Sequence, residues 1–144
     1  MDRKDIIIVA LVASDGAIHT PVQIQKLLFL IDKNLSKHLK GPFFNFEPYA
    51  YGPFDSDIYS VLENLEKEGF VETISSPNLS WSKYRLTPQG QKRGYELLNS
   101  IDSKIADYIR KLSEFIRSLS FSELLSVIYK EYPEMKKYSV FRTV

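Results

Sequence analysis

The stretch from Thr20 to Lys40 sets the strongest constraint on how this chain folds. Thr20 is a favourable N-cap residue, and Pro21 suits the first helical position because an N–H group would be unpaired there anyway. The following Gly41-Pro42 pair is typical of a helix end. These signals predict one long helix around which the other elements are arranged.

At about 100° per residue, this helix has a broad apolar face and a polar face. The apolar face holds Ile24, Leu27, Leu28, Ile31, Leu35 and Leu39. The polar face holds Gln25, Lys26, Asp32, Lys33, Ser36 and Lys40. Phe29 interrupts the polar face, and a helix with a second apolar spot is normally covered on both sides. The pattern therefore predicts a cover over Phe29, supplied by this chain or by a partner.

The segment 43–54 is the candidate cover. Its aromatic residues are Phe43, Phe44, Phe46, Tyr49, Tyr51 and Phe54. Prolines at positions 42, 48 and 53 exclude a regular helix, so an ordered, extended loop is expected.

We predict that Tyr49, Tyr51 and Phe54 pack near Phe29 and leave an aromatic edge exposed. Such an apolar patch, rimmed by Lys26, Lys33 and Asp57, is typical of a protein-binding site. The candidate partner-binding residues are Phe29, Tyr49, Tyr51, Phe54 and Asp57. The alternative is that all six aromatic side chains of the segment are ordinary core residues.

The rest of the chain is predicted to form helices and one hairpin. The expected elements are helices over 2–13 and 55–68, strands over 70–74 and 81–86, and further helices from Pro88 onward. Three consecutive isoleucines at 6–8 would also suit a buried strand. Weak helix formers at 99–102 indicate a break, and Ser120 with Glu123 has the spacing of a capping box. Trp81, near the hairpin tip, is either a half-buried anchor or a partner contact.

From Leu98 to Leu119 the apolar positions alternate in steps of three and four residues, which is heptad spacing. The run consists of Leu98, Ile101, Ile105, Tyr108, Leu112, Phe115 and Leu119. It predicts either a dimer seam or a face that packs on the chain's own domain. The candidate seam residues are Ile105, Tyr108, Leu112 and Phe115.

Composition narrows the class of protein. The chain has 144 residues, of which 44% are apolar, enough for one domain with an added helix. Without cysteine it has neither disulfides nor thiolate metal sites. A net charge of +1 gives no overall attraction to nucleic acid or membrane. The apolar run 6–13 is too short to span a bilayer and lacks a cleavage pattern, so we expect a soluble, cytoplasmic protein.

A search for catalytic patterns finds none. Neither His19 nor His38 has a second metal ligand at helical spacing, and there is no glycine-rich phosphate loop or G-x-S-x-G motif. Asp55 and Asp57 lie at a helix start, where capping and the helix dipole explain them. We therefore expect a protein that is not an enzyme and that uses no metal and no cofactor.

The order helix, helix, helix, two-stranded hairpin, long helix is that of a winged-helix domain. The segments 66–71 and 84–90 together resemble the wing of PadR-like regulators, with its "helix, Gly, aromatic, strand … Tyr-x-Leu-Thr-x-x-Gly" run. The resemblance implies an α+β, mainly helical winged-helix domain over 1–97 with a two-stranded wing. Residues 98–144 would form a C-terminal helical extension that packs on this domain or dimerises.

A second resemblance lies in the segments 26–30 and 51–54, followed by a helix that contains Tyr59. These residues resemble the Panacea (SocA-like) antitoxin-associated proteins, and the run 129–133 is similar to the tail of their winged-helix relatives. The resemblance implies a non-catalytic module that binds and regulates a partner protein, such as a toxin or a defence-system effector. Phe54 differs from the small aliphatic residue that usually follows Gly-Pro in that family.

The alternative function is that of a dimeric, DNA-binding transcription regulator. In a winged helix the third helix usually lies in the major groove, and here residues 55–68 hold five acidic residues against Lys67, a net charge of −4. Because attraction to phosphates supplies most non-specific affinity for DNA, this helix would be repelled. A contact led by the wing remains open. The candidate nucleic-acid contacts are Lys83, Arg85, Lys92 and Arg93.

Overall fold

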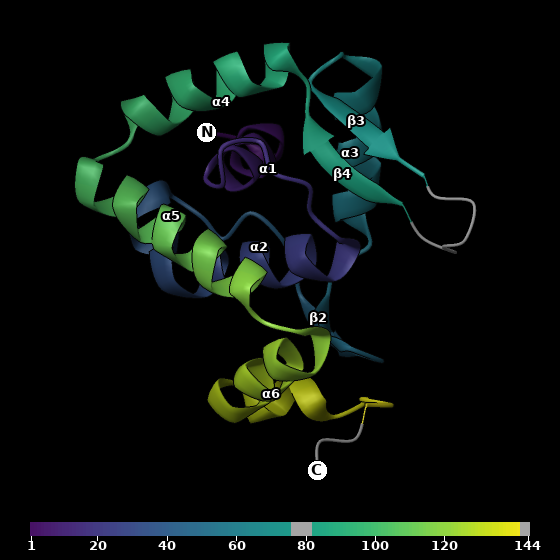
Figure 1. Ribbon diagram of the computed structural model, residues 1–144. Coiled ribbons are helices and arrows are strands. Elements are labelled where there is room, and N and C mark those ends of the chain that lie inside the picture. Colours follow the sequence, from purple (N-terminus) through teal and green to yellow (C-terminus); the bar gives the residue numbers. More distant parts are fainter. Residues whose placement is uncertain (76–81, 142–144) are drawn as a thin grey trace.

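The computed structural model describes residues 1–75 and 82–141, and in these ranges the chain is mainly helical with two small antiparallel sheets (Figure 1). The predicted α+β class is confirmed. The N-terminal elements are α1 (Arg3–Val12), α2 (Pro21–Leu39), β1 (Glu47–Tyr49), β2 (Gly52–Phe54) and α3 (Asp57–Lys67). They are followed by β3 (Val71–Ile74), β4 (Lys83–Leu86), α4 (Pro88–Ser100), α5 (Ser103–Ser118), α6 (Phe121–Glu131) and the 3-10 helix η1 (Pro133–Lys136).

Helix α2 begins and ends where the sequence predicts. The Thr20 hydroxyl accepts a hydrogen bond from the backbone N–H of Gln23 at 3.2 Å, and Pro21 is the first helical residue. Lys40, in the left-handed conformation with φ of 60°, ends the helix. The predicted long helix is therefore present, and it contacts α1 and β2 as well as α5 of the C-terminal part.

The isoleucine-rich segment is the helix α1 and not a strand. It is seen end-on at the centre of Figure 1, where it contacts α2, α3, α4 and β4. Every residue from Ile6 to Val12 is buried. A helix that is covered on all sides needs apolar residues all round, which explains why its sequence lacks an amphipathic period.

Strands β3 and β4 form the predicted hairpin, with Val71 opposite Leu86 and Ile74 opposite Lys83. The backbone of His19 pairs with Tyr84 through two N–H···O bonds of 2.8 and 2.9 Å, so the connection between α1 and α2 lies along the free edge of β4. Apart from the β1–β2 hairpin between α2 and α3, this order of elements agrees with the predicted order of helix, helix, helix, hairpin and helix. Trp81 lies outside the described residues.

The C-terminal helices extend from this core. Helix α4 ends at Ser100 and Asp102 caps α5, so the predicted break is confirmed and the predicted domain boundary after residue 97 falls inside α4. Helix α5 packs along α2, and α6 begins with the expected capping box of Ser120 and Glu123. None of the helices in the described ranges is long and apolar enough to cross a membrane.

Candidate functional site

Residues 41–55 cover part of the polar face of α2, the part that holds Gln25, Lys26 and Asp32, although the sequence predicts that this face contacts solvent. The side chains of Gln25 and Lys26 are only 1% and 2% exposed. The Gln25 amide donates to Asp55 O and accepts from Asp55 N, both at 3.0 Å. Lys26 Nζ donates to Pro53 O at 3.0 Å. These polar residues fix the backbone of the covering segment, so Lys26 does not form part of the predicted rim.

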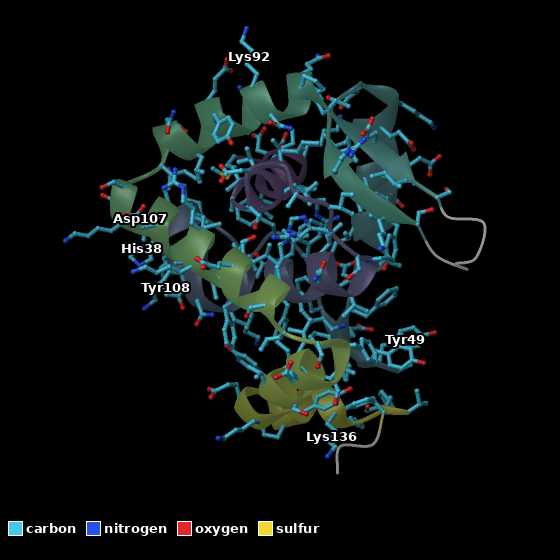
Figure 2. The ribbon with its side chains drawn as sticks, in the orientation of Figure 1. His38, Tyr49, Lys92, Asp107, Tyr108 and Lys136 are labelled. Carbon is cyan, nitrogen blue, oxygen red and sulfur yellow. The ribbon has the colours of Figure 1, made fainter. Side chains whose placement is uncertain are left out.

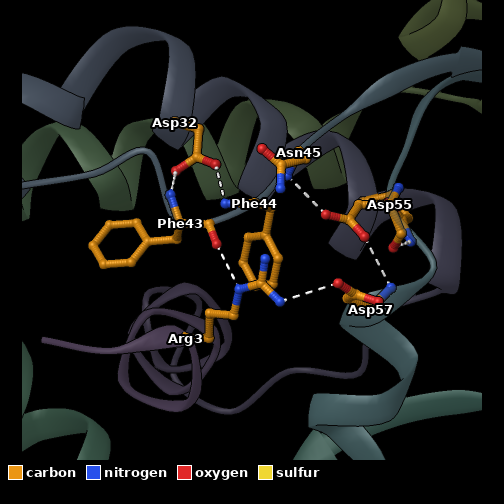
Figure 3. Close-up of polar contacts among 8 residues, drawn as sticks. Arg3, Asp32, Phe43, Phe44, Asn45, Asp55 and Asp57 are labelled. Atoms are coloured by element: carbon orange, nitrogen blue, oxygen red, sulfur yellow. Dashed lines mark hydrogen bonds and ion pairs between the residues drawn. The ribbon is translucent and has the colours of Figure 1, made fainter.

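Carboxylates hold the first half of the same segment in place (Figure 3). Asp32 accepts hydrogen bonds from the backbone N–H groups of Phe43 and Phe44 at 2.9 and 3.0 Å. Asp55 accepts from Asn45 N at 2.8 Å and from Asp57 N at 2.9 Å. Burial raises the pKa of the Asp32 carboxyl, against the opposing effect of its two N–H donors. These bonds make the segment an ordered part of the fold.

Asp57, a predicted partner contact, belongs to this polar network. Its carboxylate forms an ion pair with Arg3 Nη1 at 3.2 Å, and Arg3 Nε also donates to Phe43 O at 2.7 Å. The Asp57 side chain thus links the start of α3 to the start of α1. It remains exposed to solvent, but its charge is balanced within the chain.

Phe29 is a core residue, and its prediction as a partner-binding residue is wrong. Its side chain is fully buried. The rings of Phe46 and Tyr132 meet it edge-on, with centroid distances of 5.4 and 4.9 Å. The predicted cover therefore exists and comes from this chain, but Phe46 and Tyr132 provide it in place of Tyr49, Tyr51 and Phe54. Lys33 also lies close, with Nζ 5.7 Å from the centre of the Phe29 ring.

The remaining predicted aromatic residues lie together on the surface of the β1–β2 hairpin. Tyr49 is 55% exposed and Tyr51 is 48% exposed. The Tyr49 ring contacts Phe54 at a centroid distance of 5.1 Å. The Tyr51 ring contacts Phe121 of α6 at 5.4 Å, and Phe121 is itself 44% exposed. We call these four residues, Tyr49, Tyr51, Phe54 and Phe121, the aromatic surface.

Sequence reasoning missed Phe121. It lies 70 residues after Tyr51 in the chain, and its local pattern is that of the first residue of a capped helix. The two residues meet because α6 packs against β2. No signal within either segment reveals this contact.

Two of the hollows that adjoin the aromatic surface share lining residues. The larger, of about 650 Å³, lies between the starts of α2 and α6. It is lined by Thr20, Pro21, Val22, Gln23, Tyr51, Leu119, Phe121 and Leu124. The smaller, of about 280 Å³, lies beside the hairpin tip and reaches Lys26. Val22 and Tyr51 line both, so the hollows adjoin each other.

Lys26 is unusual among the charged residues of the site. Its side chain is buried, and no carboxylate of the described residues lies within ion-pair distance of it. Burial lowers the pKa of its amine to about 7. The fold thus places an ammonium group that is easily deprotonated next to an apolar hollow.

The four candidate nucleic-acid contacts lie on β4 and α4. Arg85 is paired with Glu72 on the neighbouring strand, and Arg93 lies 3.5 Å from Asp5 and 3.9 Å from Glu96. Lys92 points away from the outer side of α4 into solvent (Figure 2). Lys83 is partly exposed. Two of the four positive charges are therefore balanced by neighbouring carboxylates.

The predicted seam residues lie beside the buried face of α5. That face consists of Ala106, Ile109, Ser113 and Ile116. Ile105 and Leu112 are half-buried, whereas Tyr108 and Phe115 are exposed. In Figure 2, Tyr108 and Tyr49 lie at opposite sides of the view. The seam stripe and the aromatic surface are thus separate parts of the molecule.

Comparisons with known proteins define no family for this chain. The sequence matches no protein-family model and no curated protein. One solved structure with a similar arrangement is that of the organohalide-sensing transcriptional regulator RdhR-CbdbA1625 in its ligand-free form. The two chains are 13% identical with a TM-score of 0.44, over 98% of this chain and 72% of the other. Within residues 1–75 and 82–141, no cluster of three or more metal-ligating side chains is found.

Proposed function

We propose that this chain is a non-catalytic winged-helix module that binds and regulates a partner protein through its aromatic surface. The observation that carries the proposal is that Tyr49, Tyr51 and Phe121 of the aromatic surface are each about half exposed and line the two adjoining hollows. Aromatic side chains are enriched at protein interfaces and supply much of their binding energy. Burying them against a partner removes apolar area from water.

The scaffold beneath this surface is ordered before any partner binds. Gln25 and Lys26 bond the backbone of residues 53–55, and Val140 N donates to Ala50 O at 2.9 Å. The Tyr129 hydroxyl is bonded to Ser139 Oγ at 2.6 Å, which fixes the segment that carries Val140. An interface held in position in this way loses less conformational entropy on binding.

The resemblance to Panacea proteins supports a toxin or defence-system effector as the partner. The two segments that carry the resemblance, 26–30 and 51–54, contact each other through the bond from Lys26 Nζ to Pro53 O. The shared residues thus belong to one structural unit, and the aromatic surface is its exposed side. The module would restrain its partner by occupying a surface that the partner needs for its activity.

The test compares affinity purifications of the tagged chain from its own cells, quantified by mass spectrometry. Tyr51→Ala/Phe121→Ala is the site variant, and Tyr95→Ala, an exposed tyrosine on α4, is the control. We expect one protein to be retained by wild type and by Tyr95→Ala and to fall at least tenfold with the site variant. Calorimetry with the purified partner should give the same ranking, at unchanged melting temperatures. Equal retention by all three chains would overturn the proposal.

A DNA-binding transcription regulator is the second candidate. It is favoured by the wing and by Lys83 and Lys92, which no ion pair among the described residues neutralises. Such contacts would reach the DNA backbone and carry little sequence information. The double variant Lys83→Ala/Lys92→Ala should weaken DNA binding and leave the partner protein bound, whereas Tyr51→Ala/Phe121→Ala should do the reverse.

A further inference from the structure

We propose that the hollow of about 280 Å³ beside Lys26 binds a small organic carboxylate, with its charge on Lys26 Nζ and its apolar body among the aromatic side chains. The inference concerns a small ligand and does not depend on the proposed partner protein. It is tested on the purified chain alone, so its failure is distinct from a failure of the proposed function.

The shape and lining of the hollow favour a single ring or a short alkyl chain. Its walls come from α2, the hairpin and α3, and the residues that matter are Val22, Tyr49, Tyr51, Phe54 and Tyr59. An apolar cavity of about 150 Å³ holds one benzene molecule. The volume here therefore accommodates a ring with a short acidic side chain. Tyr49 and Tyr51 are both about half exposed, so ligand has access from solvent.

Lys26 provides the reason for an anionic ligand. Its ammonium group has three N–H donors, and its one acceptor among the described residues is Pro53 O. The side chain is 2% exposed and has no carboxylate partner in those residues. A buried charge without a counter-charge is costly. A carboxylate would bring the missing charge together with two acceptor oxygens.

The other titratable groups around Lys26 are four tyrosines and one aspartate. Tyr49, Tyr51 and Tyr59 line the hollow, and Tyr129 of α6 lies against Gly52. Burial raises the pKa of Tyr59, which therefore stays neutral. The Asp55 carboxylate is bonded to backbone N–H groups of Asn45 and Asp57. Lys26 is accordingly the group whose protonation controls binding.

The inference predicts a specific dependence on pH. Burial lowers the pKa of free Lys26 to about 7, and a bound carboxylate raises it again because it stabilises the ammonium form. Below pH 7 the free protein already holds the proton, so affinity is nearly constant. Well above pH 7 each binding event must take up a proton, and from about pH 8 affinity falls by about tenfold per pH unit.

Calorimetry and NMR titrations with benzoate, 3-phenylpropanoate and hexanoate, from pH 6 to 9, test the inference. At least one of these acids should bind with a dissociation constant of about 1 mM or lower at pH 6 and weaken about tenfold between pH 8 and 9. Lys26→Met should reduce affinity at least tenfold. Lys33→Met, on the exposed side of the same helix, should have no effect.

Two further measurements separate loss of the site from loss of the fold. Val22→Trp, which fills the hollow and retains Lys26, should abolish binding while the far-UV circular dichroism is unchanged. The neutral alcohol 3-phenylpropanol should bind more weakly than the acid and without dependence on pH. The inference is wrong if none of the three acids binds, if Lys26→Met binds them as tightly as wild type, or if acid and alcohol bind equally.

Discussion

His19 is the residue that makes this fold sensitive to acid. Its side chain is fully buried where the β3–β4 hairpin meets the connection between α1 and α2. Nδ1 donates to Ala17 O at 2.9 Å, and Nε2 is the one buried side-chain nitrogen or oxygen of the described residues without a partner. Burial lowers the pKa of His19 to about 4, so its imidazole is neutral in the folded protein.

We predict that the free energy of unfolding falls as the pH decreases from 6.5 to 4. In this window the unfolded chain protonates His19 and the folded chain does not, so protons favour unfolding. A pKa lowered from 6.5 to about 4 corresponds to about 3 kcal/mol over the whole window. Urea denaturation at several pH values measures this effect. His19→Gln should remove most of the slope, and His38→Gln, at an exposed position, should retain it; an unchanged slope in His19→Gln would contradict the prediction.

The burial of the polar residues of α2 could not be predicted from the sequence. Helical periodicity places Gln25, Lys26 and Asp32 on one face, but it does not reveal what covers that face. The cover is a segment that contains three prolines. The backbone N–H and C=O groups of this segment still need hydrogen-bond partners when they are buried. Polar side chains on α2 supply those partners. The same cover explains why Phe29 is core, and only the tertiary structure shows it.

At the scale of helices and strands, local signals predicted most of the structure. The caps at Thr20, Thr87 and Ser120 and the break near residue 101 depend on neighbouring residues alone, so the sequence contains them in full. The segment that forms β1 and β2 was expected only as an extended loop. Proline argues against a strand, and here Pro48 lies opposite Pro53 in the hairpin. Three of the four residues of the aromatic surface were predicted, since Tyr49, Tyr51 and Phe54 lie on one segment and Phe121 does not.

Helix α4 packs closely on the residue that precedes β3. For Gly90→Ala, helix propensity and this tertiary contact predict changes in stability of opposite sign. Helix propensity alone predicts that Gly90→Ala stabilises the chain by about 1 kcal/mol. A Cβ at Gly90, however, would lie 2.0 Å from the backbone oxygen of Phe70, which cannot rotate away. We therefore expect destabilisation by roughly 2 to 4 kcal/mol in chemical denaturation. Gln89→Ala, one residue earlier and exposed, should stay within about 0.5 kcal/mol of wild type. A stabilised Gly90→Ala would contradict this view of the contact.

The stripe on α5 leads to a prediction about self-association. Ile105, Tyr108, Leu112 and Phe115 lie beside the face that packs on α2, and Tyr108 and Phe115 remain exposed. We propose that a second copy covers this stripe in a homodimer. Sedimentation equilibrium should show a dimer for wild type and a folded monomer for Leu112→Glu. Glu114→Gln, at an exposed position on the same helix, should remain dimeric. A wild-type monomer throughout the micromolar range would end the proposal.

At the scale of the whole molecule, several ion pairs join neighbouring elements. Arg3 and Lys4 of α1 pair with Asp57 and Glu68 at the two ends of α3. Arg93 of α4 similarly pairs with Asp5, and the net charge of the chain is only +1. The outer face of α3 keeps the acidic residues Glu63 and Glu66 exposed, and Lys67 pairs with Glu63 at 3.4 Å, so the remaining excess of negative charge would repel phosphate.

This charge distribution predicts that wild type binds DNA weakly and that reversing two charges on α3 strengthens the binding. In fluorescence anisotropy with a random-sequence duplex at 0.15 M salt, wild type should bind with a dissociation constant above about 10⁻⁴ M, the weak end of non-specific binding. Glu63→Lys/Glu66→Lys should bind at least tenfold more tightly, with a steep loss of affinity as salt increases. Glu114→Lys/Glu131→Lys changes the net charge equally on α5 and α6 and should bind less tightly than the α3 variant. Tight, sequence-specific binding by wild type that Asn64→Ala abolishes would mean that α3 reads bases and that the DNA-binding candidate is the correct one.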